Sequence, residues 1–279
     1  MAKETPFKFE QVIYEKENGV GTLIMNNPKT LNALSQTMSS ELQQAFLDGE
    51  KDPAISAFIL TGSGDRAFSS GADLSMGVEG GMVTGGKKPE ENPAGVRRVA
   101  TPGSASPLPQ WIWRNVEKPL VAAVNGVCAG MGGVSALASD IRIMSENARF
   151  AHVYNRRGLV VSGESWFLPR IMGLGPALYH IMMADDTFAE EALRLGLVSK
   201  VVPQAQLLEE ARNIAEHLAD GPQTALRFTK KAVYKGLNLS FFDAMDQVGL
   251  LRAANSASNE SREGFKAFAE KRKPAFSFR

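Results

Sequence analysis

Hydrophobic and polar positions alternate near the start of the chain and then recur at a helical spacing. Within residues 9–26, Val12 and Tyr14 alternate with polar neighbours, which predicts two strands of a β-hairpin. Within residues 35–47, apolar side chains recur every fourth position and predict a helix. The apolar run at residues 57–61 predicts a buried strand. Strand, helix, strand in this order is typical of an α/β fold.

A second strand-to-helix unit follows a long irregular stretch. Residues 77–110 are rich in Gly, Pro and Ser and predict a lid-like insertion or a surface loop. An apolar strand at residues 119–124 then leads into a glycine cluster and a run of small residues, and residues 140–144 resume the sheet. From residue 187 onward the pattern is mostly helical. We therefore expect an α/β core over residues 1–200 and a helical C-terminal region over residues 201–279.

The last long amphipathic stretch, residues 241–268, carries several large apolar side chains. We expect Phe241, Phe242 and Met245 to be buried against the core or against another subunit.

Composition excludes several classes of function. The chain has 279 residues, a net charge of +1 and 44% hydrophobic residues, so a general attraction to nucleic acid is not expected. One cysteine, Cys128, and three histidines are too few for a structural zinc site, and no metal is expected. No apolar run has the length of a signal peptide core or a membrane helix, so we expect a cytoplasmic protein without membrane contact.

Two turns with little side chain carry the candidate chemistry. The first is Ser69-Ser70-Gly71-Ala72-Asp73, and the second is Gly130-Met131-Gly132-Gly133 at a strand-to-helix junction. Such turns expose backbone N–H groups, and two of them facing each other would form an oxyanion hole. A tight turn that needs glycine for packing alone is the alternative for each. Neither turn contains a dinucleotide or P-loop phosphate motif.

Five segments resemble the crotonase (enoyl-CoA hydratase/isomerase) superfamily: residues 27–34, 68–74, 118–126, 139–142 and 191–198. The resemblance extends from about residue 9 to residue 276. It implies repeated β-β-α turns that form two roughly perpendicular sheets, with a helical C-terminal region that serves trimerisation and pocket closure. It also implies a homotrimer or homohexamer and an acyl-CoA thioester substrate, with coenzyme A as part of the substrate and no permanently bound cofactor.

The resemblance assigns roles to individual positions. It makes the backbone N–H groups of Ala72 and Met131 the oxyanion-hole donors, although Met131 stands where hydratases of the family have glycine. Further positions are expected to bind the substrate. These are Lys29 and Lys273 toward coenzyme A, Ser70 and Asp73 in the first turn, and Val134, His152 and Trp166 around the acyl group.

The two carboxylates that hydratases of this family use are replaced here. Their positions read Val134 and Tyr154, and neither residue can act as a glutamate does. Glu164 is the nearest remaining acid, either as the catalytic acid/base or as a charge that favours a helix N-terminus. Tyr154 is expected to hydrogen-bond the acyl group or to pack beside it. The other histidines, His180 and His217, have no partner motif and are expected to be structural or exposed.

Three functions remain open at this point. The first is an enoyl-CoA hydratase or isomerase that works through a thioester enolate, and isomerisation needs only one acid/base. The second is a hydrolase or a C–C bond cleaving enzyme with the same oxyanion hole. The third is an acyl-CoA-binding or assembly subunit without catalysis. The missing glutamates favour this third function, whereas the retained glycine turns and the long insertion favour an enzyme, and the first function is the one that we expect.

Overall fold

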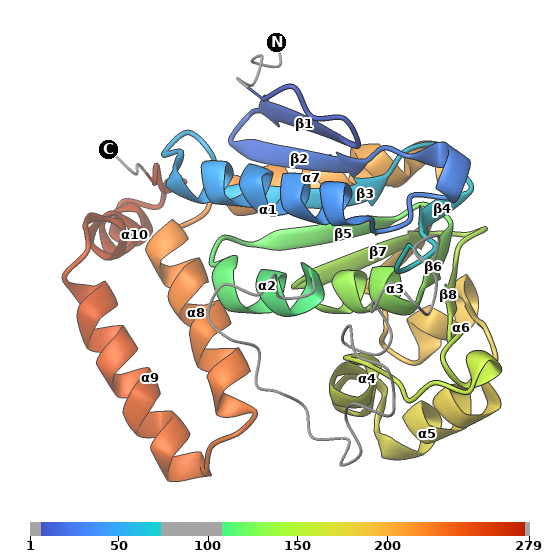
Figure 1. Ribbon diagram of the computed structural model, residues 1–279. Coiled ribbons are helices and arrows are strands. Elements are labelled where there is room, and N and C mark those ends of the chain that lie inside the picture. Colours follow the sequence, from blue (N-terminus) through green and yellow to red (C-terminus); the bar gives the residue numbers. More distant parts are fainter. Residues whose placement is uncertain (1–6, 74–107, 277–279) are drawn as a thin grey trace, which may run out of the picture.

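The computed structural model describes residues 7–73 and 108–276, which form two sheets surrounded by helices (Figure 1). The larger sheet has six strands in the order β1-β2-β3-β5-β7-β10. The first pair is antiparallel and the other four pairs are parallel. Its strands are β1 (Val12–Glu17), β2 (Val20–Met25), β3 (Ala57–Gly62), β5 (Leu120–Val124), β7 (Ile141–Ser145) and β10 (Lys200–Val202).

The smaller sheet has four short strands in the order β4-β6-β8-β9. The pairs β4-β6 and β6-β8 are parallel, whereas β8 and β9 are antiparallel. Its strands are β4 (Ala67–Ser69), β6 (Val127–Ala129), β8 (Arg149–Ala151) and β9 (Thr187–Phe188). The predicted α/β class with two sheets is confirmed.

The described ranges 7–73 and 108–276 contain ten α-helices. They are α1 (Gln36–Lys51), α2 (Leu108–Asn115), α3 (Gly130–Leu137), α4 (Glu164–Met172), α5 (Leu174–Met183), α6 (Ala189–Arg194), α7 (Leu207–Ala219), α8 (Gln223–Gly236), α9 (Phe241–Ser256) and α10 (Asn259–Ala269). Helices α8, α9 and α10 lie together to one side of the sheets (Figure 1). Short 3₁₀ helices are η1 (Pro28–Thr30), η4 (Asn155–Arg157) and η5 (Gln204–Gln206).

A strand-strand-helix order is repeated along the chain. In the units beginning with β3, β5 and β7, the first strand joins the larger sheet and the second joins the smaller one. The α-helix that follows the two strands is α3 in the unit beginning with β5 and α4 in the unit beginning with β7. Each unit therefore carries the chain from one sheet to the other, and the turns that follow β4 and β6 come to lie side by side because these strands pair.

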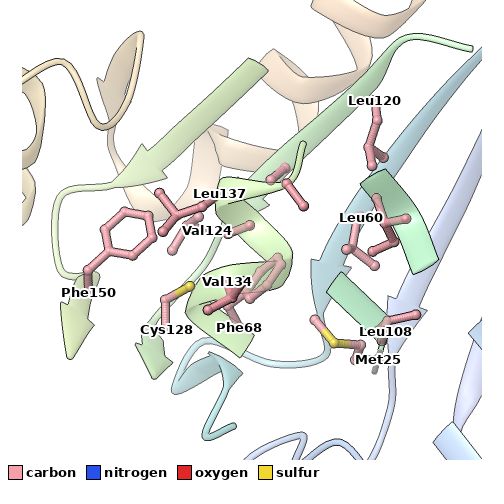
Figure 2. Packing of buried hydrophobic residues seen from close by; sticks show 14 of the residues in the cluster. Met25, Leu60, Phe68, Leu108, Leu120, Val124, Cys128, Val134, Leu137 and Phe150 are labelled. Carbon is pink, nitrogen blue, oxygen red and sulfur yellow. The ribbon is translucent and has the colours of Figure 1, made fainter. Parts of the chain in front are cut away.

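The two faces of the larger sheet have separate cores. On one face, side chains of the sheet pack with α1, α2, α3 and α4, and Figure 2 shows Phe68, Val134 and Cys128 close together beside α3. On the other face, α7 covers a smaller cluster that includes Ile59, Val121 and Leu207. Helices cover both faces of this mostly parallel sheet, as is usual for parallel strands, and both faces are accordingly apolar.

The local expectations for the first half are confirmed. Residues 9–26 contain the β1-β2 hairpin, and residues 57–62 are the fully buried β3. The helix expected over residues 35–47 is α1, whose N-cap Ser35 accepts a hydrogen bond from the backbone N–H of Met38. Most of the insertion expected at 77–110 lies outside the described residues, and its last residues begin α2.

The C-terminal region differs in part from the expectation. Residues 241–268 form two helices, α9 and α10, rather than one. Within the chain, Phe241 and Phe242 are 70% and 78% exposed, and Met245 is also exposed, so burial against the core is wrong for these side chains. Burial against another subunit stays a prediction. The division at residue 200 also stays a prediction, although β10 and α7 pack with the larger sheet.

Candidate active site

The first glycine turn follows β4 and runs beside Leu34. The N–H of Leu34 donates to Gly71 O, and the N–H of Asp73 donates to Leu34 O. Ala72 is thus paired with Leu34 in a parallel bridge. The hydrogen bonds of this bridge are made by Gly71 and Asp73, the two neighbours of Ala72. Consequently the N–H of Ala72 itself points away from Leu34.

The second glycine turn begins α3. Gly130 has a φ of +48°, and Ala129 is an N-cap whose side chain makes no capping hydrogen bond. The first four N–H groups of a helix have no acceptor within the helix, and the positive end of the helix dipole lies behind them. Met131 is the second residue of α3, so its N–H is one of these groups.

The two turns approach each other closely because they lack side chains. A Cβ atom on Gly71, whose φ is +99°, would lie 2.9 Å from Ala129 O and 3.5 Å from the backbone nitrogen of Met131. A Cβ atom on Gly132 would lie 2.5 Å from Ser69 Cβ and 2.7 Å from Ser69 Oγ. Glycine is therefore required at both positions for the backbone of one turn to reach the other.

Two buried asparagines fix the entry to the first turn. Asn125 Nδ2 donates to the carbonyl oxygens of Gly62 and Gly64, and its Oδ1 accepts from the N–H of Gly62. Asn32 Nδ2 donates to Ala67 O. These side chains tie the β3-β4 connection to the neighbouring units. Both residues lie in segments that carry the family resemblance, 27–34 and 118–126, and no local pattern predicted their role.

Glu164 is the first residue of α4, and its carboxylate is buried with 2% of the residue exposed. Oε1 lies 3.5 Å from His152 Nδ1 and 3.9 Å from where a Cβ atom on Gly133 would be. Oε2 is buried without a hydrogen-bonding partner among the described residues. The carboxylate thus points toward the first turn of α3 and is held between α3 and the segment after β8.

The charge of Glu164 affects two neighbouring groups. Burial raises the pKa of Tyr154 to about 12, and the Glu164 carboxylate adds to the rise. Burial and then the same carboxylate raise the pKa of the Cys128 thiol well above its usual value. The hydroxyl of Tyr154 is buried and would lie 3.8 Å from a Cβ atom on Gly130. Both groups therefore stay neutral at physiological pH, and the Tyr154 hydroxyl lies at the start of α3.

Val134 occupies the position at which the family resemblance leads one to expect a glutamate. The side chain is 1% exposed, and its Cγ1 lies only 2.4 Å from where a Cβ atom on Gly163 would be. Val134 thus packs against the residue that precedes Glu164. An apolar contact at this place lets α4 begin directly beside α3.

The remaining expected site residues are spread over several places. Ser70 donates from its hydroxyl to Thr30 O, which ties the first turn to η1, and Lys29 is exposed on the same 3₁₀ helix. Lys273 follows α10 in the chain, and its side chain is exposed. Helix α10 lies at the other end of the molecule from β4 and β6 (Figure 1). Within one chain, the structure therefore does not bring Lys273 to the two turns.

Trp166 belongs to an aromatic cluster between α2, α4 and α8. Its ring centroid is 4.8 Å from that of Trp113, which in turn is 4.2 Å from that of Tyr234. Trp113 and Tyr234 also line a cavity of about 430 Å³ between α2 and α8. This cavity is separate from the residues around Glu164, and five basic side chains line it: Arg114, Arg227, Lys230, Lys231 and Lys235.

His180 has partners that sequence analysis missed. Its Nδ1 lies 3.2 Å from Thr187 Oγ1, which is itself 3.1 Å from His152 Nε2. Thr187 comes from β9 and His180 from α5, so no local pattern in the sequence links either of them with His152. His217, by contrast, is exposed on α7, as expected.

Comparison with known proteins identifies the family. The model of the enoyl-CoA hydratase/isomerase family matches residues 15–279. The chain belongs to this family. It is 34% identical to a crotonyl-CoA hydratase of Syntrophomonas wolfei over 276 residues, covering 96% of this chain and 98% of that protein. It is 31% identical to the 1,2-epoxyphenylacetyl-CoA isomerase of Escherichia coli, covering 96% and 98% of the two chains.

Solved structures of the enoyl-CoA hydratase/isomerase family agree with the fold. A crystal structure of an enoyl-CoA hydratase/isomerase from Mycobacterium paratuberculosis superimposes with a TM-score of 0.85 at 31% identity, covering 98% of this chain and all of that one. The resemblance noted in the sequence is therefore confirmed as family membership, with an enzyme of the crotonase type implied. Hydratases and an isomerase both occur among the relatives, so the family alone does not decide the reaction.

Two further findings concern the part of the chain that the structure describes. Residues 7–73 and 108–276 contain no group of three or more His, Cys, Asp or Glu side chains placed to hold a metal ion. In the same ranges, no helix combines the length and the apolar character that crossing a membrane demands.

Proposed function

We propose that this protein isomerises the double bond of an enoyl-CoA thioester through an enolate, with Glu164 as the single acid/base. The observation that carries the proposal is the burial of one carboxylate beside two backbone turns that face each other. Glu164 Oε1 lies near Gly133, while Gly71 approaches the nitrogen of Met131. These two contacts support a site in which a proton acceptor, Glu164, works together with two N–H donors, those of Ala72 and Met131.

The turns supply the stabilisation of negative charge. The N–H groups of Ala72 and Met131 bind the thioester oxygen, which becomes an oxyanion when a proton leaves the adjacent carbon. Fixed donors of this kind need no reorganisation during the reaction, and the loss of one typically costs about 100-fold to 1,000-fold in rate. The dipole of α3 adds to the effect because Met131 is in its first turn.

Glu164 supplies the proton transfer. Its carboxylate takes a proton from C2 of a 3-enoyl thioester, and the C2–H electron pair enters the dienolate. The same carboxyl group then returns a proton to C4, and the double bond moves from C3–C4 to C2–C3. One acid/base suffices for both steps. Hydration, in contrast, calls for a second group that activates water, and the two family positions for that pair hold Val134 and Tyr154.

Other side chains shape the pocket. Tyr154, whose buried hydroxyl lies at the start of α3, donates a hydrogen bond to the acyl group. Met131 and Val134 limit the acyl shape, and His152 orients Glu164. Ser70 and Asp73 position the first turn, while Lys29 attracts the phosphates of coenzyme A. Coenzyme A enters only as part of the substrate.

The test is a panel of 2-enoyl and 3-enoyl thioesters of coenzyme A with short, long, branched and aromatic acyl groups, with products identified by mass and isomer. We expect isomers of unchanged mass from the 3-enoyl substrates. Products that gain the mass of water as the main outcome would instead show a hydratase. Release of free coenzyme A would show a hydrolase, and binding without any turnover would show an acyl-CoA-binding subunit.

The variant Glu164→Gln assigns the proton transfer. It keeps size and hydrogen bonding but removes the acid/base, so turnover should fall about 100-fold or more while the melting temperature changes little. If Glu164 only favours the N-terminus of α4, turnover stays near that of the wild type and stability falls by a few tenths to about 1 kcal/mol. The second result would refute the assignment.

A further inference from the structure

The cavity between α2 and α8 has a volume of about 430 Å³ and lies apart from the residues around Glu164. A volume of this size is within the range of sites that bind small organic ligands. Helices α2 and α8 form its two sides (Figure 1). The proposed isomerisation uses none of the side chains that line this cavity.

Apolar side chains form the inner wall of the cavity. Val116 is 4% exposed, and Trp113 and Phe228, which also line the cavity, are half-buried. The ring of Trp113 is held in place by Trp166 and Tyr234, whose ring centroids are 4.8 and 4.2 Å away. The wall therefore offers a fixed apolar surface, and an apolar body gains free energy by leaving water to cover it.

The cavity is already formed in the single chain because α8 is fastened to the larger sheet. Asp140, directly before β7, accepts hydrogen bonds from Lys230 Nζ and Tyr234 Oη of α8, at 2.8 and 2.7 Å. The same carboxylate accepts from the N–H of Leu120 at the start of β5, at 2.8 Å. Helix α8 is thus held in place without a ligand, and no free energy is spent on opening the site.

Positive charge surrounds the apolar wall. Arg227, Lys231 and Lys235 follow one another every four residues along α8, and Arg114 belongs to α2 on the other side of the cavity. Like charges at this spacing are neighbours on a helix and repel each other. The last turn of a helix favours a cation, which accounts for Arg114 and Lys235. It does not account for Lys231, which lies before the last turn of α8.

Carboxylates of the protein leave much of this charge unmatched. Among the described residues that line the cavity, Glu117 is the acidic one. Within residues 7–73 and 108–276, no ion pair joins Arg114, Lys231 or Lys235 to a carboxylate. All three side chains are exposed, so they lie at the mouth of the cavity. The cavity therefore combines an apolar inner wall with a cationic mouth.

We propose that this cavity is a second binding site, separate from Glu164, for an amphipathic carboxylate, namely an aliphatic chain that ends in one carboxylate group. The chain lies along the apolar wall, and the carboxylate faces Arg114, Lys231 and Lys235. A guanidinium can donate two parallel hydrogen bonds to the two carboxylate oxygens, and each lysine adds a point charge. A small inorganic anion would leave the apolar wall in water, and an aliphatic cation would be repelled at the mouth.

Calorimetric titration with dodecanoate, kept below its micelle concentration, tests the proposal. Dodecyltrimethylammonium is the matched probe, because it has a similar chain and the opposite charge. We expect dodecanoate to bind at least about tenfold more tightly than this cation. Equal affinities would show that the apolar wall acts alone. Displacement of dodecanoate by an equal concentration of inorganic phosphate would show an anion site without an apolar part. Either result would overturn the proposal.

Charge reversal at the mouth locates the bound probe. The double variant Lys231→Glu and Lys235→Glu changes two exposed side chains and should weaken dodecanoate binding about tenfold or more. Arg114→Glu, on the other helix, should weaken it as well, and it tests the proposal even if the double variant does not fold. Arg212→Glu is the control, since Arg212 is exposed on α7, which covers the other face of the larger sheet. Wild-type affinity in both cavity variants, or an equal loss in the control, would contradict the assignment.

A titration in the presence of saturating hexanoyl-CoA separates this cavity from the site around Glu164. We expect dodecanoate to bind with unchanged affinity, because the thioester occupies the other site. Loss of dodecanoate binding would show that the probe enters the acyl site, and the second site would be refuted. Glu164→Gln should also leave dodecanoate binding unchanged, since Glu164 does not line the cavity. The second site therefore stands or falls independently of the proposed isomerisation.

Discussion

Gly132→Ala tests whether the close approach of the two turns is needed for activity. The added Cβ atom would lie 2.5 Å from Ser69 Cβ, about 0.9 Å short of the 3.4 Å at which ordinary contact begins. Ser69 is fully buried in β4, and its carbonyl oxygen would lie 2.9 Å from the new atom, so the obstruction involves backbone as well as side chain. The turns must therefore move apart.

Two opposing terms set the expected loss of stability. Overpacking of this size typically costs about 1–3 kcal/mol. Alanine in a helix gains roughly 0.5–1 kcal/mol over glycine, because glycine loses more conformational entropy. We therefore expect Gly132→Ala to lower the free energy of unfolding by at most about 2.5 kcal/mol, with about 1 kcal/mol for mid-range values of both terms. We expect kcat/KM to fall about 10-fold to 100-fold because Met131 N–H is displaced.

The assay compares urea unfolding and kcat/KM on the best 3-enoyl thioester. Gly249→Ala is the matched control, since Gly249 lies inside α9 and an added Cβ atom meets nothing within 4 Å. We expect this control to gain about 0.5–1 kcal/mol and to keep full activity. A Gly132→Ala protein with wild-type stability and wild-type kcat/KM would refute the reasoning.

Three further predictions concern other parts of the molecule. Met131→Pro removes one oxyanion donor at a first-turn position that tolerates proline, so kcat should fall about 100-fold to 1,000-fold in a folded protein; unchanged turnover would contradict the assignment. Burial lowers the pKa of Lys118 from 10.5 to about 8, so the folded chain binds fewer protons than the unfolded chain between these values. The free energy of unfolding should then rise by up to about 3 kcal/mol from pH 8 to pH 10.5, and Lys118→Met should flatten that rise in denaturant titrations. Light scattering at micromolar concentration should show the trimer or hexamer that the family resemblance implies, in which another subunit would cover Phe241 and Phe242, both exposed in the single chain; a stable monomer would contradict this.

The elements of the core could be predicted because short-range patterns specify them. The spacing of Met38, Leu42 and Phe46 predicted α1, and all three side chains are fully buried in the structure. The separation of α9 from α10 was not predicted. The boundary lies in a polar run, residues 255–264, in which Ser258 caps α10 by accepting from the N–H of Ser261, so the local sequence did carry a signal for a helix start.

The candidate site could be predicted where it lies in turns and not where it depends on pairing between distant segments. The glycine turns were found from their composition, and the pairing of β4 with β6 sets them side by side. The contact between His180 and Thr187 depends on how α5 returns to β9. Sequence patterns record the period of an element, and they do not record which side chains of two distant elements meet.

A crystal structure with a saturated acyl-CoA that binds without reacting would show where the thioester lies. We expect the thioester oxygen about 2.7–3.1 Å from the backbone nitrogens of both Ala72 and Met131. We also expect the Glu164 carboxylate within about 3–3.5 Å of the carbon next to the thioester. A thioester bound elsewhere, such as in the cavity between α2 and α8, or a Glu164 turned away from that carbon, would contradict the proposed roles of the two turns and of Glu164.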